Sequence, residues 1–223
     1  MMSAETFEAR MVAYRLGQLK KEGFEKVQVP VGHCGKWKVE RFVIDQEGAS
    51  HHNMLEAIHG RRRMVMPGEY TRLCYGGEVV MSDTPAEMDE HRSFVFRAQG
   101  QVLIMGLGLG VCLAAVARKP EVHHVTVVER SEEVVALVGP HYRTLLGPRL
   151  TLVQADALTW RPQKGQRFDT IWHDIWTNIC GDNWKEVVQL HRRFAPYLRR
   201  VDGAGGWQGS WCKEEVRRLG KYA

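Results

Sequence analysis

The chain has 223 residues, of which 44% are hydrophobic and 26% charged, as in an ordinary globular protein. It contains no uncharged apolar run of about eighteen residues or more, so no membrane-spanning helix is predicted. The N-terminus carries acids and bases too early for a secretory signal, and we therefore expect a cytoplasmic protein.

Charge and cysteine content limit the classes of partner. The net charge is +5, which favours an acidic partner such as a nucleic acid. The basic residues are dispersed as short pairs and triplets, however, and this pattern is more typical of solvated helix faces. The five cysteines are scattered without a Cys-x-x-Cys pair, so free thiols and no metal site are predicted.

The first part of the chain, residues 1–98, is predicted to be a helix followed by a small β-containing extension. Apolar residues at helical spacing predict an amphipathic helix over residues 3–22. Residues 36–44 alternate between apolar and polar side chains, which predicts a half-buried strand, and residues 51–59 predict a short helix. Turn signals in residues 67–83 frame another strand-like stretch.

Strands and helices alternate regularly in the second part, residues 99–223. Apolar runs predict the strands, and periodicity with start signals predicts the helices. This alternation is typical of a doubly wound, mostly parallel Rossmann-like α/β sheet. The strands are predicted at 101–105, 123–129, 150–156, 168–174 and 205–211. The helices are predicted at 110–118, 131–142 and 184–201.

A glycine-rich loop follows the first of these strands and opens the first helix. Such sheets bind ligands at the carboxyl ends of their strands, where glycine lets the backbone turn sharply and approach a ligand. The second strand ends in Glu129, suited to ribose hydroxyls, and the third in Asp156, suited to an exocyclic amine of a base. Together they predict an adenosine pocket. The predicted cofactor-binding residues are Gly106, Leu107, Gly108, Gly110, Glu129, Arg130, Asp156 and Ala157.

Residues 101–178 resemble the cofactor domain of class I S-adenosylmethionine-dependent methyltransferases. The resemblance rests on VLIMGLGLG in the glycine loop, VTVVER at the ribose acid and VQADAL at the adenine acid. Within that superfamily the sequence is most similar to the polyamine (spermidine) synthase branch, through LCYGGEVVMSDTPAEMDEH, FDTIWHDIW and GGWQGSW. The resemblance implies S-adenosylmethionine, or its decarboxylated form, as the cofactor.

The sequence also departs from both family patterns. Polyamine synthases carry an aspartate where this chain has Leu109 and a glutamine where it has Val80, and their Asp-Pro after the fourth strand is absent. Methyltransferases commonly carry an acid where this chain has Ile104. Both usual anchors for the methionine amine are therefore missing, which argues against aminopropyl transfer to a diamine. The amine is expected to meet backbone carbonyls or one of three acids, Asp83, Glu87 and Asp174. Asp83 and Glu87 are also predicted to bind substrate.

Asp174, at the end of the fourth predicted strand, is the predicted catalytic residue. In the resembling enzymes an acid at this place deprotonates or orients the incoming nucleophile, as in-line transfer requires. Trp172 and Trp176 are predicted to bind substrate as a water-excluding wall or a face for an aromatic or cationic group. Strand alternation points His173 to the opposite face, where we expect a packed histidine. The alternative for Asp174 is a helix or turn cap.

The function predicted from these features is that of an S-adenosylmethionine-dependent methyltransferase of unknown substrate. A small-molecule substrate is expected, and no membrane partner. Two alternatives stay open: a spermidine synthase-like aminopropyltransferase, and a non-catalytic protein that keeps the fold and binds a nucleoside or cofactor. Methyltransferases of this class add an antiparallel hairpin after the fifth strand, whereas residues 212–223 are short and helical in character. We therefore expect either an abbreviated sheet or an edge covered by a partner chain, because an uncovered edge strand tends to pair, and we predict a homodimer.

Overall fold

The structure is a computed structural model that describes residues 14, 17–59, 63–201 and 204–220. Of the helix predicted over residues 3–22, residue 14 and residues 17–21 are helical, and most of the remainder lies outside the described residues. No helix in the described part of the chain is both long and apolar enough to cross a membrane.

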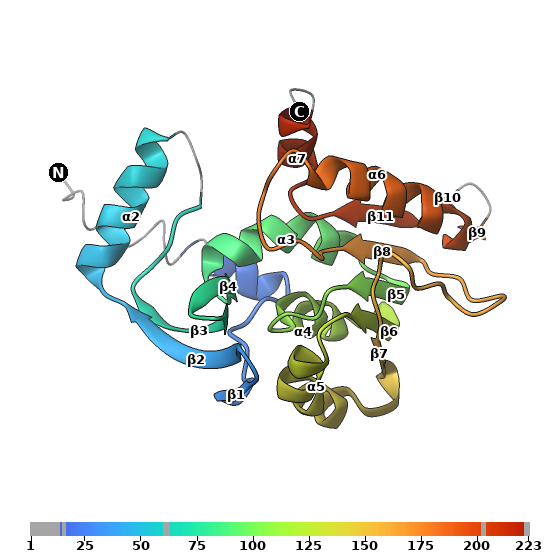
Figure 1. Cartoon of the computed structure of the whole chain (residues 1–223), viewed down its shortest axis with the longest axis horizontal. Coiled ribbons are helices and arrows are strands. Elements are labelled where there is room, and N and C mark those ends of the chain that lie inside the picture. The colour runs from blue at the N-terminus through green and yellow to red at the C-terminus, as the bar shows by residue number, and fades with distance from the viewer. Residues whose placement is uncertain (1–13, 15–16, 60–62, 202–203, 221–223) are drawn as a thin grey trace.

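Five parallel strands form the central sheet (Figure 1), as the alternating pattern predicted. They are β5 (Gly100–Met105), β6 (Val122–Glu129), β7 (Leu150–Gln154), β8 (Thr170–His173) and β11 (Trp207–Ser210). Their order is β11-β8-β5-β6-β7, and every neighbouring pair is parallel. The chain crosses from the β7 edge back to β8, so the topological switch point lies between β5 and β8. Ligands of such sheets bind beside that point.

Helices cover both faces of this sheet. The helices α4 (Val111–Ala117), α5 (Glu132–Leu146) and α6 (Asn183–Phe194) correspond to the three predicted ones. The start of α5 is fixed by Ser131, whose hydroxyl accepts a hydrogen bond from the Val134 N–H. A short helix, α7 (Lys213–Leu219), follows β11.

The sequence prediction missed the helix α3 (Pro85–Arg97), which lies directly before β5. Its buried side chains include Met88, His91 and Phe94, so a histidine interrupts the apolar stripe that would have revealed it. A start signal was present, because proline occupies the first turn and Glu87 adds an acid there. This helix contributes directly to the candidate site.

The N-terminal extension contains a second, antiparallel sheet of four strands in sequence order. They are β1 (Gly32–Cys34), β2 (Trp37–Ile44), β3 (Gly68–Tyr75) and β4 (Glu78–Ser82). The helix α2 (Gln46–Ile58) connects β2 to β3. It begins earlier than predicted, because the side chain of Asp45 accepts a hydrogen bond from the Gly48 N–H and so caps the start of the helix. A two-stranded pair, β9 (Arg200–Val201) with β10 (Ala204–Gly205), precedes β11.

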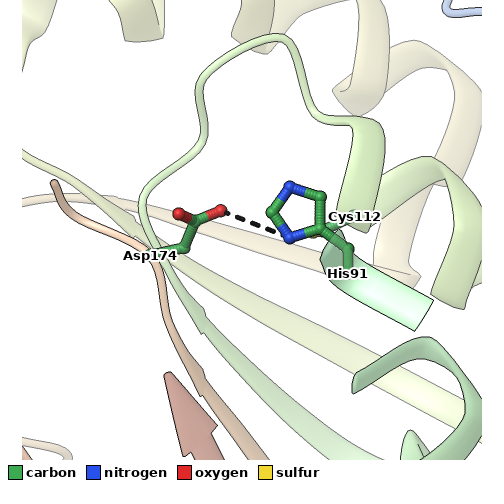
Figure 2. Close-up of side chains that lie close together, drawn as sticks. All are labelled: His91, Cys112 and Asp174. Atoms are coloured by element: carbon green, nitrogen blue, oxygen red, sulfur yellow. Dashed lines mark ion pairs between the residues drawn. The ribbon is translucent and has the colours of Figure 1, made fainter. Parts of the chain in front are cut away.

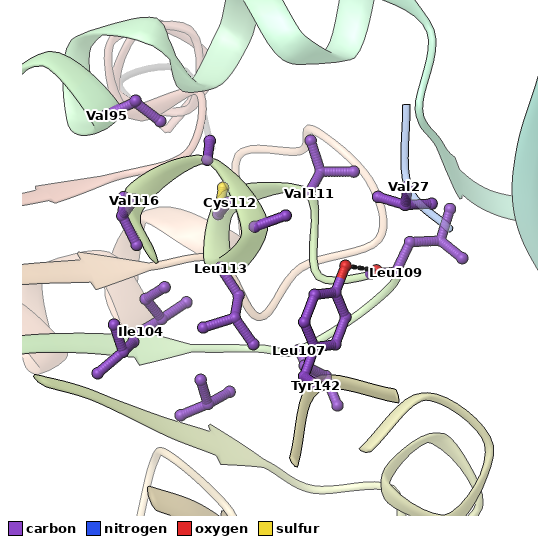
Figure 3. Packing of buried hydrophobic residues seen from close by; sticks show 14 of the residues in the cluster. Val27, Val95, Ile104, Leu107, Leu109, Val111, Cys112, Leu113, Val116 and Tyr142 are labelled. Atoms are coloured by element: carbon purple, nitrogen blue, oxygen red, sulfur yellow. Dashed lines mark hydrogen bonds between the residues drawn. The ribbon is translucent and has the colours of Figure 1, made fainter. Parts of the chain in front are cut away.

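One buried cluster joins the extension to the central sheet. Val39 and Leu73 of the antiparallel sheet belong to the same cluster as Ile104 of β5 and residues of α3, α4 and α5. Figure 3 shows part of this packing, including Val27 near the glycine loop. A second cluster lies on the other face, where Leu103 and its neighbours pack against α6. Leu103 and Ile104 are neighbours in β5 and pack into opposite clusters, as strand alternation requires. Both faces of the strand are therefore buried, which explains its uninterrupted apolar run.

Candidate active site

A cleft of about 1520 Å³ opens at the carboxyl ends of the central strands. It lies beside the switch point between β5 and β8, where this architecture binds ligands. The cleft lining brings together most of the predicted site residues: Gly106, Leu107, Gly108, Glu129, Arg130, Asp156, Ala157, Glu87, Trp172, Asp174 and Trp176. Two predicted site residues, Gly110 and Asp83, are absent from this lining.

The glycine loop is in direct backbone contact with the end of β8. Gly106 has a φ of +97°, and a Cβ built there would lie 1.9 Å from the Asp174 carbonyl oxygen. The Asp174 N–H donates to the Met105 carbonyl at 2.8 Å, which holds the two segments together. A Cβ at Gly108, with a φ of +50°, would lie 2.1 Å from the Met81 sulfur. Position 106 therefore requires glycine for conformation and for space, whereas at Gly108 the positive φ is the main requirement because the Met81 side chain is flexible.

Glu129 ends β6 with its carboxylate fixed on the glycine loop. Its Oε2 accepts a hydrogen bond from the Leu107 N–H and its Oε1 one from the Ser131 N–H, both at 2.8 Å. The side chain is half-buried and lines the cleft. Since each carboxylate oxygen can accept more than one hydrogen bond, this fixed group keeps capacity for two hydroxyls of a ligand.

Asp156 combines a turn cap with a place in the cleft. Its Oδ1 accepts from the Leu158 N–H at 2.8 Å, and its carbonyl accepts from the Trp160 N–H at 2.7 Å. The residue lines the cleft with Ala157, which is buried behind it. The cap uses one carboxylate oxygen and leaves the other with acceptor capacity for a ligand amine.

Gly110, predicted to bind the cofactor, lies outside the cleft lining and has a packing role. It has a φ of +74°, and a Cβ there would lie 2.2 Å from the ring of Tyr142. The Tyr142 hydroxyl donates to the carbonyls of Leu109 and Gly110, at 2.8 and 3.0 Å (Figure 3). The glycine therefore makes room for a tyrosine that ties the loop to α5.

Asp174 follows β8 at the floor of the cleft, with its side chain 21% exposed. Burial raises its pKa to about 7, and the nearby carboxylates of Glu87 and Glu90 add to this rise, while the indole of Trp172 opposes it. The Nδ1 atom of His91 lies 3.9 Å from its Oδ2 atom (Figure 2). The carboxyl group thus changes its protonation near neutral pH, as a general base must.

The two tryptophans line the cleft in different ways. Trp172 is 2% exposed and stacks between Phe94 and Trp207, at ring-centroid distances of 5.0 and 6.1 Å. Trp176 is half-buried and donates from its Nε1 to the carboxylate of Glu186 at 2.7 Å. Trp172 is therefore a rigid part of the wall, and Trp176 is held by α6.

His173 faces away from the cleft, as strand alternation predicted. It is fully buried, and its ring packs against those of His191 and Phe194. Burial lowers its pKa to about 3, so it is neutral at physiological pH. The expectation of a packed histidine is confirmed.

The two acids before β5 have different placements. Glu87 lines the cleft and accepts hydrogen bonds from the backbone N–H and the hydroxyl of Ser82. Burial raises the pKa of Glu87 to about 7. Asp83 is fully buried, and its carboxylate accepts from the N–H groups of Thr71 and Val27 at 2.7 and 2.9 Å. Asp83 therefore ties segments of the extension together and lies outside the cleft lining, where a substrate contact was predicted.

Sequence reasoning missed three residues that surround Asp174. His91 and Glu90 come from α3, and Cys112 comes from the first turn of α4. All three line the cleft. Helical periodicity in α3 would have placed His91 on the side of Met88 and Phe94, but the helix itself was not predicted.

Comparison with known proteins supports the motif-based resemblance. No family model matches the chain. Polyamine aminopropyltransferase 1 of Streptomyces coelicolor is 33% identical over 111 residues, which cover 45% of this chain and 21% of that relative. Polyamine aminopropyltransferase 2 of Ralstonia nicotianae is 32% identical over 80 residues, covering 33% of this chain and 16% of that relative. The matches thus span a small part of the relatives' length, and they confirm the resemblance to the polyamine synthase branch.

Solved structures with a partly similar arrangement of elements include a spermidine synthase and a methyltransferase. Spermidine synthase in complex with the transition state analogue AdoDATO has a TM-score of 0.42 and 14% identity, covering 76% of this chain and 54% of that one. The CcbJ methyltransferase from Streptomyces caelestis has a TM-score of 0.41 and 22% identity, covering 49% of this chain and 44% of that one. Both likenesses are partial and concern the fold alone.

Proposed function

We propose that this protein is a transferase that uses S-adenosylmethionine to methylate a small amine acceptor held at Asp174. The observation that carries the proposal is that Glu129, Asp156, the glycine loop and Asp174 line one cleft. The first three suit the adenosine part of the cofactor, since both carboxylates are fixed by backbone N–H groups and retain acceptor capacity. The residues present therefore fit the cofactor.

Charge around Asp174 favours an amine as the acceptor. Glu87 and Glu90 line the same part of the cleft and raise the pKa of Asp174 through their negative charge. An ammonium group is attracted to such a cluster, whereas a carboxylate or phosphate is repelled. Trp172 adds a flat, rigid wall against which the carbon chain of an amine packs.

Asp174 acts as the base in this proposal. The bound cofactor supplies an electrophilic methyl group on a positively charged sulfur. Asp174 takes the proton of the acceptor ammonium, which frees the nitrogen lone pair for in-line attack, and later releases the proton to solvent. With a pKa near 7, a substantial fraction of this group is ionised at neutral pH and able to accept the proton.

Aminopropyl transfer is the second candidate, because the curated relatives are polyamine aminopropyltransferases. The decarboxylated cofactor has no carboxylate to be repelled by the acids near Asp174. Against it stands Leu109, which occupies the place of the family's loop aspartate and is fully buried. The tail amine thus has no loop carboxylate to bind.

Calorimetric titration with three ligands separates these candidates. Methyl transfer predicts binding of S-adenosylmethionine and S-adenosylhomocysteine at least about tenfold tighter than binding of the decarboxylated cofactor, or about 1.4 kcal/mol. The reverse order supports aminopropyl transfer. If none of the three binds, both enzymatic proposals are wrong, and the non-catalytic alternative is favoured.

The remaining features of the proposal concern organisation. We propose residues 99–223 as the cofactor-binding domain and residues 1–98 as its extension, although one buried cluster joins them. A small-molecule acceptor is the proposed partner. The homodimer and a nucleic-acid partner remain predictions from the sequence, which light scattering and a filter-binding titration would test.

A further inference from the structure

Three potential metal ligands converge next to the catalytic candidate (Figure 2). They are His91 on α3, Cys112 on α4 and Asp174 after β8, so three separate elements supply one group each. The ligand atoms, an imidazole nitrogen, the thiol sulfur and a carboxylate oxygen, all lie within 4.8 Å of one another. Among the described residues, this is the group of histidine, cysteine and acidic side chains whose ligand atoms lie close enough together to hold a metal ion.

The imidazole of His91 is buried without a hydrogen bond on its Nδ1 atom. The residue is 3% exposed, and within the described part of the chain this atom has no hydrogen-bond partner. Asp174 Oδ2 is 3.9 Å away, which is too far for a hydrogen bond. Buried polar atoms of this kind are rare in folded proteins and call for a binding partner. A cation between Nδ1 and Oδ2 would satisfy both atoms.

The donor set suits zinc. Thiolate, imidazole and carboxylate are the ligands of Zn²⁺ in proteins, with bond lengths of roughly 2.0–2.3 Å. Tetrahedral geometry with such bonds separates the ligand atoms by about 3.5 Å. The distance of 3.9 Å between His91 Nδ1 and Asp174 Oδ2 is somewhat wider, and a small side-chain rotation would bring these two atoms to that separation.

The residues around His91, Cys112 and Asp174 favour a metal ion that keeps one coordination position free. Glu87, Glu90 and Glu129 contribute negative charge near Asp174. His91 and Cys112 are buried, whereas Asp174 is partly exposed, and all three line the cleft. An ion held by them would have protein on one side and the cleft on the other. Three protein ligands and an open position are the arrangement of catalytic zinc sites.

We propose that His91, Cys112 and Asp174 bind Zn²⁺, with the fourth coordination position open to the cleft. Binding forms one bond from each ligand atom to the ion, and the thiol proton of Cys112 is released to solvent. The inference does not depend on the proposed transfer reaction. If both hold, Asp174 is a ligand in the loaded protein and no longer the base, and a hydroxide on the ion at the open position would accept the proton of the acceptor ammonium and become water, leaving the nitrogen lone pair free.

Cobalt(II) titration of the metal-free full-length protein tests this site without the cofactor. The expected result is one ion per chain with a sulfur-to-cobalt charge-transfer band, and displacement of the cobalt by zinc. Cys112→Ser is expected to abolish the band, and His91→Gln to weaken binding at least about tenfold. Cys74→Ser is the matched control, because Cys74 is also a buried free cysteine but lies in β3. That variant is expected to bind like the wild type.

Two outcomes would overturn the proposal: the wild type shows no charge-transfer band, or the band persists in Cys112→Ser. Circular dichroism of each variant shows whether it is folded. If Cys112→Ser does not fold, Asp174→Asn provides the same test, since it removes a ligand that is partly exposed. Unchanged cobalt affinity in folded Asp174→Asn also contradicts the proposal. Calorimetry with S-adenosylhomocysteine on the metal-free protein tests the proposed function separately.

Discussion

The two halves of the cleft are built differently. The cofactor half consists of the glycine loop, Glu129 and Asp156, each placed directly after its own strand in one continuous run of βα units. The acceptor half consists of Asp174 with His91 and Cys112, which come from β8, α3 and α4. Local spacing along the chain defines the first half, and packing between distant elements defines the second. A cofactor class is therefore easier to infer from sequence than an acceptor.

Gly106→Ala is expected to have the largest effect, because position 106 is where the two halves touch. The added Cβ would lie 1.9 Å from the Asp174 carbonyl oxygen at a φ of +97°. We expect the free energy of unfolding to fall by more than about 3 kcal/mol, and binding of S-adenosylhomocysteine to be lost. Urea denaturation and calorimetry measure the two effects.

Gly76→Ala is the matched control for that variant. Gly76 also has a positive φ, +59°, but a Cβ there meets nothing within 4 Å. It therefore reports the conformational cost alone, about 1 kcal/mol, with no change in cofactor binding. Equal losses in the two variants would show that the contact between the loop and Asp174 is unimportant.

Glu129→Ala is expected to weaken the cofactor half selectively. It removes the carboxylate that accepts from the Leu107 and Ser131 N–H groups and that is proposed to hold the ribose. Affinity for S-adenosylhomocysteine should fall about 10- to 100-fold, since hydrogen bonds to charged groups contribute about 1.5–3 kcal/mol. Glu132→Ala, an exposed acid in the first turn of α5, is the control. Unchanged affinity in Glu129→Ala would refute the proposed adenosine pocket.

The sequence placed most residues of the proposed cofactor half in one cleft because their signals are local. The buried strands, the glycines at their ends and the acid ending the second strand are all readable within a short window. Strand alternation also placed Trp172 in the cleft and His173 away from it. Gly110 is not among the residues that line the cleft, and Tyr142 of α5 occupies the space that its missing side chain leaves.

The acceptor half was only partly predictable because its contacts join distant segments. Asp174 was found by its place at a strand end and Glu87 as an acid in the segment before β5, but His91 lies on a helix that was not predicted. The role of Asp83 depends on the N–H groups of Val27 and Thr71, and no local pattern reveals that pairing. The position of an acid along the chain, close to residues that line a cleft, therefore does not reveal the direction in which its side chain points.

Asp83→Asn tests whether that acid belongs to the structure or to the cleft. An amide cannot accept from both backbone N–H groups as the carboxylate does, so the free energy of unfolding is expected to fall by about 1–3 kcal/mol. Affinity for S-adenosylhomocysteine should not change. Asp45→Asn, at an exposed helix cap, is the control and should stay near wild-type stability, because asparagine also caps helices. A loss of affinity without a loss of stability in Asp83→Asn would restore the expected substrate contact.

Asp174→Asn is expected to make the smallest change, a gain of stability at alkaline pH. Burial raises the pKa of Asp174 from 3.8 to about 7, so the folded protein binds this proton more tightly than the unfolded chain does. Its contribution to stability is therefore present below about pH 4 and is lost as the pH rises toward 7, which leaves a buried charge at pH 8. Asparagine carries no such charge but still requires hydrogen bonds, so the variant should be about 1 kcal/mol more stable than the wild type at pH 8, and about equal at pH 4. Urea denaturation at both pH values measures this difference, with Asp182→Asn as the exposed control. A variant that is less stable at pH 8 would indicate that the ionised carboxylate is held by a compensating positive charge, and the base proposed for the acceptor half would then be wrong.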